Sequence, residues 1–96
     1  MYKRASLKNK IIPSMRLVDF SDMVVPLVVI YNRPEDFPDR IVARVWEGSI
    51  NRPTNICCLY PDVDGSRKDL QAAGFELLMV RDLRDEPCIV ETWIKK

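Results

Sequence analysis

Carboxylates are the main side chains that could carry out chemistry, because the sequence contains no histidine. Histidine is the commonest general base and a frequent metal ligand, so its absence removes the usual centre of both kinds of site. The stretch DVDG, residues 62–65, is similar to the start of a calcium-binding loop. The later ligands and the closing glutamate of such a loop are missing, so these residues better suit a turn and a helix cap.

The three cysteines also favour packing over chemistry. Cys57 and Cys58 are adjacent on an expected strand, where consecutive side chains leave opposite faces, so they cannot hold one metal ion together. An odd, unspaced set does not suit a disulfide framework, and we expect reduced thiols in a cytoplasmic protein. Three scattered glycines are too few for a phosphate-binding loop. We therefore predict no catalytic residue, no metal site and no cofactor, and we expect that the protein is not an enzyme.

The apolar pattern predicts the elements that must position any site. Residues 24–31 are an almost unbroken apolar and β-branched run, typical of a central strand covered on both faces. Further strands are expected, in chain order, at residues 40–47, 55–60, 76–82 and 88–95. A short helix is expected at residues 66–73. Ser66 and Asp69 have the spacing of a capping box, and Gly74 suits the left-handed residue that ends a helix.

These elements predict an α+β fold at residues 23–96. Short connections favour hairpins over crossovers, so we expect a mainly antiparallel sheet of four or five strands with one short helix on one face, in the order β-β-β-α-β-β. The residues expected to be mostly buried are Leu27, Val29, Ile41, Val45, Ile56, Leu59, Leu70, Phe75, Leu78, Val80, Val90 and Ile94.

Residues 1–22 are expected to form a basic N-terminal extension, since they show no regular apolar period. They carry five basic and two acidic residues, whereas residues 23–96 carry ten basic and twelve acidic residues. A mildly acidic body argues against a folded surface that grips phosphate backbones. Met23 directly precedes the first strand, so an upstream start could also account for the extension. The longest apolar run is far shorter than the ~20 residues of a membrane-spanning helix, and we expect no membrane association.

Two tryptophans supply the candidate binding site. Alternation places Arg44 with Trp46 on one face of their strand, and Glu91 with Trp93 on one face of theirs. We predict that both tryptophans lie on the sheet face opposite the helix, with the arginine and the glutamate as polar neighbours. Such mixtures are enriched at interaction hot spots. Alternatively, the N-terminal extension or the second subunit of a homodimer could cover this face.

Four segments carry a resemblance to known proteins: DFPDRIVARVW (residues 36–46), RPTN (52–55), GF (74–75) and DEPCIVETWI (85–94). Over residues 23–96 they resemble a group of small proteins from phages and mobile elements of Gram-positive bacteria. These segments are strand and turn signatures. The resemblance brings no established activity and no functional residues. It implies a host–virus setting, in which small non-enzymatic proteins bind and block a larger machine.

Together these observations predict a non-enzymatic protein-binding module. The resemblance adds the hypothesis of an inhibitor of a host enzyme such as a defence nuclease, in the manner of anti-CRISPR proteins. The alternative is a nucleic-acid-binding accessory protein whose basic extension holds phosphates while sheet aromatics stack on bases. Its affinity would fall with salt. The basic residues of that alternative are Lys3, Arg4, Lys8 and Lys10.

Overall fold

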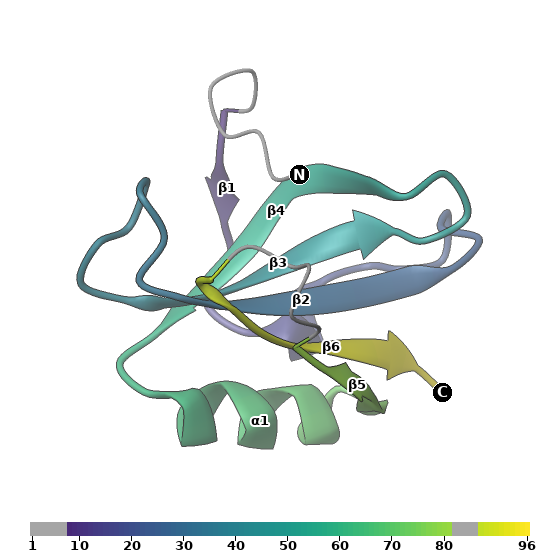
Figure 1. The fold of residues 1–96 in the computed structure, drawn as a ribbon. Coiled ribbons are helices and arrows are strands. Elements are labelled where there is room, and N and C mark those ends of the chain that lie inside the picture. Colours follow the sequence, from purple (N-terminus) through teal and green to yellow (C-terminus); the bar gives the residue numbers. More distant parts are fainter. Residues whose placement is uncertain (1–7, 82–86) are drawn as a thin grey trace.

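A computed structural model describes residues 8–81 and 87–96, which form one six-stranded sheet with an α-helix packed on one of its faces (Figure 1). Within these residues, no helix has the length and apolar character needed to cross a membrane. The elements are, in chain order, β1 (Lys10–Ile11), the 3₁₀ helix η1 (Met15–Leu17), β2 (Pro26–Asn32), β3 (Ile41–Glu47), β4 (Arg52–Tyr60), α1 (Val63–Ala72), β5 (Phe75–Val80) and β6 (Ile89–Lys95).

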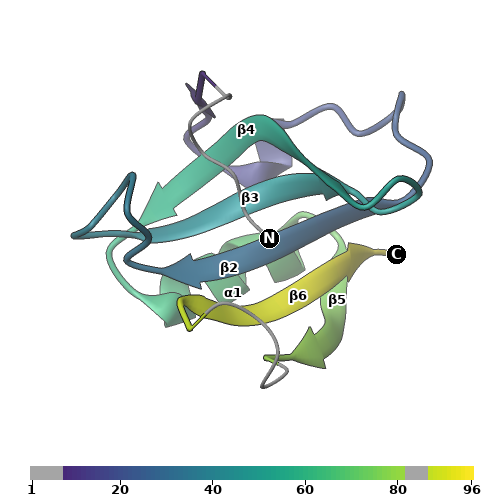
Figure 2. The same ribbon diagram turned by 45° about the horizontal axis from the view of Figure 1, so that its top comes forward.

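The strands lie in the order β1-β4-β3-β2-β6-β5, which Figure 2 shows for the five longer strands. Only β1 runs parallel to its neighbour, β4, and the other pairs are antiparallel. The predicted α+β class with one helix is therefore confirmed. The expected four or five strands become six in a mixed sheet, because the N-terminal segment adds β1. A strand of two residues has too few positions to show an alternating pattern.

The helix begins earlier than predicted. Asp62 is the N-cap, and its carboxylate accepts a hydrogen bond from the Gly65 backbone N–H at 2.7 Å. Ser66 is buried inside the helix, where its hydroxyl donates to the Val63 carbonyl at 2.6 Å, so the predicted capping box at Ser66 is wrong. Gly74 has a φ of +88°, which confirms the predicted left-handed end of the helix.

Hydrophobic side chains cover both faces of the central strands. The larger core lies under the helix, where Leu70 and Phe75 pack with Val28, Ile30 and Val45. A smaller cluster on the other face is formed by Val29, Tyr31, Val42 and Cys57. β2 is thus a two-sided central strand, as the apolar run at 24–31 predicts, but it begins at Pro26, and Val24 is 76% exposed.

Two predicted core residues are wrong. Leu78 and Val80 are 46% and 66% exposed, because β5 is an edge strand of the sheet. Asp82, the expected end of this strand, lies outside the described residues. The other predicted core residues are buried or half-buried: Leu27, Val29, Ile41, Val45, Ile56, Leu59, Leu70, Phe75, Val90 and Ile94.

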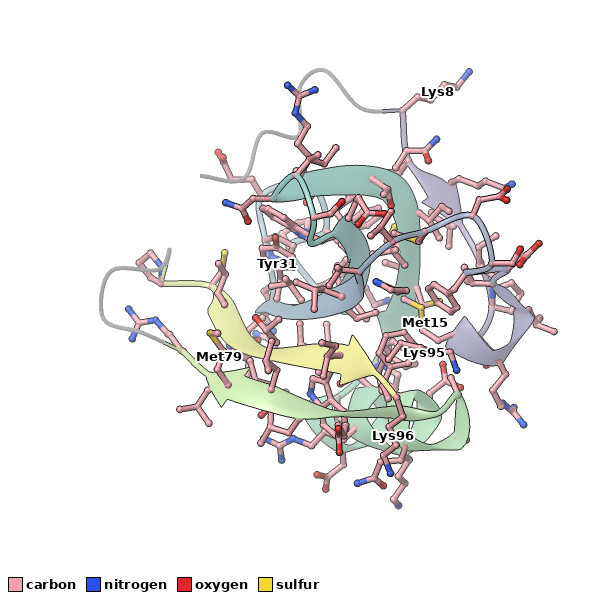
Figure 3. All side chains as sticks on the ribbon, turned by 90° about the vertical axis from the view of Figure 1, so that its right-hand side faces the viewer. Lys8, Met15, Tyr31, Met79, Lys95 and Lys96 are labelled. Atoms are coloured by element: carbon pink, nitrogen blue, oxygen red, sulfur yellow. The ribbon has the colours of Figure 1, made fainter. Side chains whose placement is uncertain are left out.

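The described part of the expected extension, residues 8–22, packs against the rest of the fold. β1 joins the edge of β4, and Met15 is fully buried in the helix-side core (Figure 3). The Asp69 carboxylate on α1 accepts hydrogen bonds from the Ser14 hydroxyl at 2.6 Å and the Met15 N–H at 2.9 Å. This segment is therefore bonded to the helix as well as to the sheet.

Candidate protein-binding surface

The predicted four-residue site is split between the two faces of the sheet. Trp46 lies opposite Leu27 in the β2–β3 pair, whereas Trp93 lies opposite Val28 in the β2–β6 pair. Adjacent residues of a strand point to opposite faces, so their partners do too. Trp46 joins the cluster away from the helix, and Trp93 is 4% exposed within the helix-side core. The prediction that both tryptophans share the face opposite the helix is wrong.

The two polar neighbours divide in the same way. Arg44 pairs with Val29 on the face away from the helix, and Glu91 pairs with Ile30 on the helix side. The grouping within each strand is right, since Arg44 shares a face with Trp46 and Glu91 shares one with Trp93. What alternation alone leaves open is which face of β6 turns towards the helix. That choice is set by the pairing of β6 with β2.

The most exposed apolar feature of the sheet is β5. It is the last strand in the sheet order, and within the described residues it pairs only with β6. Four consecutive side chains, Leu77, Leu78, Met79 and Val80, are 46–66% exposed. Met79 is labelled on this outermost strand in Figure 3. A long apolar edge strand offers both unpaired backbone groups and apolar side chains to another strand.

A β-bulge divides the β5 side chains between the two faces. Leu77 lies opposite Trp93 and Met79 lies opposite Thr92, so Leu78 is an extra residue in the ladder. Because of this shift, Leu77 and Val80 line a hollow on the helix side, whereas Leu78 and Met79 line a hollow on the other side. The edge strand therefore has a hollow along each of its two faces, and apolar side chains of β5 line both.

The helix-side hollow has a volume of about 530 Å³ and lies between α1, β5 and β6. The buried Glu91 carboxylate accepts a hydrogen bond from the Arg67 Nε at 2.7 Å and another from the Trp93 indole N–H at 3.2 Å. The hydrogen bond to Glu91 raises the pKa of Arg67. Glu91 thus anchors an arginine and a tryptophan in the wall of the hollow. The residues that line this hollow are Arg67, Gln71, Phe75, Glu76, Leu77, Val80, Glu91, Trp93 and Lys96.

The hollow on the other face has a volume of about 220 Å³ and is more apolar in its lining residues. The Trp46 indole N–H donates to the Tyr31 hydroxyl at 3.2 Å. Since this N–H is the only hydrogen-bond donor of the indole, Trp46 contributes apolar surface to the hollow. The residues that line it are Leu27, Val29, Trp46, Asn51, Leu78, Met79, Ile89 and Thr92. Each tryptophan predicted as a binding residue therefore lines one of the two hollows beside β5.

Arg44 lies outside this surface. Its side chain has no exposed area, and its guanidinium donates to the Asn9 side-chain oxygen at 2.7 Å and to the Thr54 carbonyl at 3.0 Å. It also forms an ion pair with Asp36 at 3.4 Å. These bonds connect β3 to β4, to the N-terminal segment and to the loop after β2. The buried charge of Arg44 is thus paired and hydrogen-bonded within the fold.

The acidic and cysteine side chains of the described residues are the candidates for a metal site or a nucleophile. In residues 8–81 and 87–96, no group of three or more histidine, cysteine or acidic side chains could hold a metal ion. Burial raises the pKa of the Cys57 thiol, and it raises the pKa of the Cys58 thiol to about 12, so both are protonated at neutral pH. A protonated thiol is a poor nucleophile.

The edge position of β5 could not be read from the sequence. After Glu76, the letters LLMV, residues 77–80, are apolar at successive positions, which suits a strand covered on both faces. Only the strand order places this run at the edge. Comparison of the chain with protein-family models, curated proteins and solved structures finds no match.

Proposed function

We propose that this protein is a non-enzymatic protein-binding module that takes up a strand of another polypeptide at the edge of β5. The observation that carries the proposal is the run of four exposed apolar side chains, Leu77 to Val80, on the outermost strand of the sheet. In strand addition, main-chain hydrogen bonds supply affinity, and pockets for alternate side chains supply specificity.

The two hollows could serve as the pockets that receive alternate side chains of an added strand. Side chains of an added strand alternate between the faces of the sheet, so successive residues would enter the helix-side hollow and the hollow by Trp46. The first hollow combines aromatic rings with the Arg67–Glu91 pair, and the second is mainly apolar. Aromatic residues and arginine are enriched among the residues that dominate binding energy. Trp46, Glu91 and Trp93 thus keep a place in the proposed binding surface, and Arg44 does not.

A role as an inhibitor of a host enzyme such as a defence nuclease rests on the sequence resemblance alone. The edge strand gives such an inhibitor a means of action. A small domain that adds its sheet to an exposed strand of a larger protein would cover that strand and the surface beside it.

The nucleic-acid alternative receives less support. Lys8 and Lys10 are exposed, while Lys3 and Arg4 lie outside the described residues. Trp46 and Trp93 lie on opposite faces of the sheet, so a single strand of nucleic acid could not stack its bases on both. The mildly acidic body also offers few phosphate contacts.

Substitution of Met79 by lysine tests the proposal. Lysine on an edge strand is a device by which natural proteins prevent strand pairing. We expect the wild-type chain to capture a stoichiometric protein from a nuclease-treated lysate of a Gram-positive host, and Met79→Lys to lose it. Ile11→Lys is the matched control, since Ile11 is 53% exposed on β1, at the opposite edge. Equal capture by wild type and Met79→Lys, or capture that requires nucleic acid, would contradict the proposal.

A further inference from the structure

The two edges of the sheet differ in the features that prevent pairing. At one edge, β1 has two residues and contains Lys10, and the neighbouring β4 carries Arg52 and Pro53 at its start. Short edges, basic side chains and proline all hinder the addition of a further strand. β5 has six residues, with no proline and no basic side chain, and Glu76 is its only charge. An edge without these protections suits a strand that is covered in the working form of the protein.

The β5 side chains point to the two faces of the sheet in an order that is the same whether the strand is followed forwards or backwards. Leu77 and Val80 line the helix-side hollow, and between them Leu78 and Met79 line the other hollow. Without the bulge, the side chains of four consecutive residues would alternate between the two faces of the sheet. The first and last of them would then point to opposite faces, so the order would differ between the two directions of the strand. With the bulge, a copy of β5 laid antiparallel can place Leu77 opposite Val80, and Leu78 opposite Met79, on matching faces.

The charges at the two ends of this run also favour a copy in the antiparallel direction. Glu76 precedes the four apolar residues and Arg81 follows them, and both are exposed. In an antiparallel pair, the Glu76 end of one strand lies beside the Arg81 end of the other, so opposite charges meet twice. A parallel pair would bring like charges together at both ends, which is unfavourable.

From these observations we infer that, in the free protein, the strand taken up at β5 is β5 of a second copy of this chain, which the strand of another partner would have to displace. The two copies form a two-fold symmetric dimer in which the sheet continues across the interface. Two-fold dimers are the commonest oligomers, and each uses the same surface patch on both subunits. This inference rests on the proposed function, because it uses the same edge and names the strand that covers this edge in the free protein.

An exchange of the charges at the two ends of the apolar run, Glu76 and Arg81, tests the inference. The measured quantity is the dimer dissociation constant, from analytical ultracentrifugation over a wide range of concentration. We expect the wild type to dimerise, Met79→Lys to remain monomeric and Ile11→Lys to dimerise normally. Glu76→Lys and Arg81→Glu should each raise the dissociation constant by about tenfold, because like charges then face each other at both ends. The double variant Glu76→Lys/Arg81→Glu should restore wild-type dimerisation. Circular dichroism of each variant checks that it is folded.

The outcomes separate this inference from the proposed function. A wild type that stays monomeric, but captures another protein in a Met79-dependent manner, would overturn the dimer and leave the strand-addition module intact. Dimerisation that survives Met79→Lys, or a double variant that does not recover, would also overturn the β5 pairing. A wild type that is monomeric and captures nothing would overturn both.

Discussion

Glu47, at the end of β3, uses its carboxylate to close two turns. Its two oxygens accept hydrogen bonds from the backbone N–H groups of Val24 and Val25, both at 2.9 Å. They also accept from the N–H and the hydroxyl of Ser49, at 3.1 and 2.8 Å. These donors, the Val25 N–H foremost, lower the pKa of Glu47 from its ordinary 4.5 to about 2. The carboxylate therefore holds the residues before β2 and the β3–β4 turn more strongly when it is ionised than when it is protonated.

This pKa predicts a pH-dependent contribution to the free energy of unfolding. Because the folded pKa is the lower one, the contribution of Glu47 is fully present above pH 4.5 and is lost as the pH falls towards 2. We expect Glu47→Gln to be less stable than wild type at neutral pH, with a difference that shrinks over that range. Urea unfolding of both proteins at several pH values measures it. The difference would stay constant with pH if the ionised carboxylate contributed nothing.

At the scale of elements, α1 joins the sheet to the N-terminal segment through Asp69. Besides Ser14 and Met15, its carboxylate accepts a hydrogen bond from the Tyr60 hydroxyl on β4. Burial acts to raise the pKa of Asp69, but the hydrogen bonds from Ser14, Tyr60 and Met15 outweigh it, so the pKa is lowered. One ionised side chain thus links α1 to β4 and to the N-terminal segment, which is 55 positions away at Ser14.

Removal of this link should destabilise the whole fold. We expect Asp69→Ala to lower the free energy of unfolding by roughly 1–3 kcal/mol, since it leaves buried donors without an acceptor. Asp64→Ala is the control on the same helix, because the Asp64 side chain is 81% exposed and its ion pair with Arg67, at 3.7 Å, contributes little. Urea unfolding compares the two. A similar loss in both variants would show that the Asp69 bonds are not the source of the stability.

Local patterns predict some of these elements and not others. The apolar run before Tyr31 and the alternation after Arg40 identify β2 and β3, since both follow from side chains within one strand. The role of Asp69 could not be predicted, because Ser14 is 55 positions away and the capping spacing with Ser66 offered a local alternative. β1 has too few residues for any pattern.

In the candidate site too, some features follow from the pattern within one strand and others do not. Each predicted pair, Arg44 with Trp46 and Glu91 with Trp93, follows from alternation and is found in the structure. Their placement on separate faces, and the exposure of β5, depend on the register of β6 and on the strand order. Register shifts occur in β6 between its pairs with Ile30 and Tyr31, and in β5 at Leu78. These are properties of pairing between strands, which a single strand does not encode.

At the scale of the whole molecule, one sheet separates two unequal cores. The helix-side core contains Trp93, Leu70 and Phe75, and the smaller cluster on the other face contains Tyr31 with Trp46 packed against it. Both cores are built on β2 and β3, whose successive residues point alternately into one and the other. Because the same two strands carry both cores, the loss of one core would also destabilise the other.

This arrangement predicts that the two cores unfold together. Trp46→Phe leaves Trp93 as the only tryptophan, which reports on the helix-side core, and Trp93→Phe leaves Trp46, which reports on the other face. In each variant, at a fixed protein concentration, we expect the urea transition seen by tryptophan fluorescence to coincide with that seen by far-ultraviolet circular dichroism. Coincident transitions are the mark of two-state unfolding in a small domain. If the Trp46 signal changed at lower urea than the circular dichroism, the smaller cluster would open by itself, and the hollow beside Met79 would be a mobile part of the proposed binding surface.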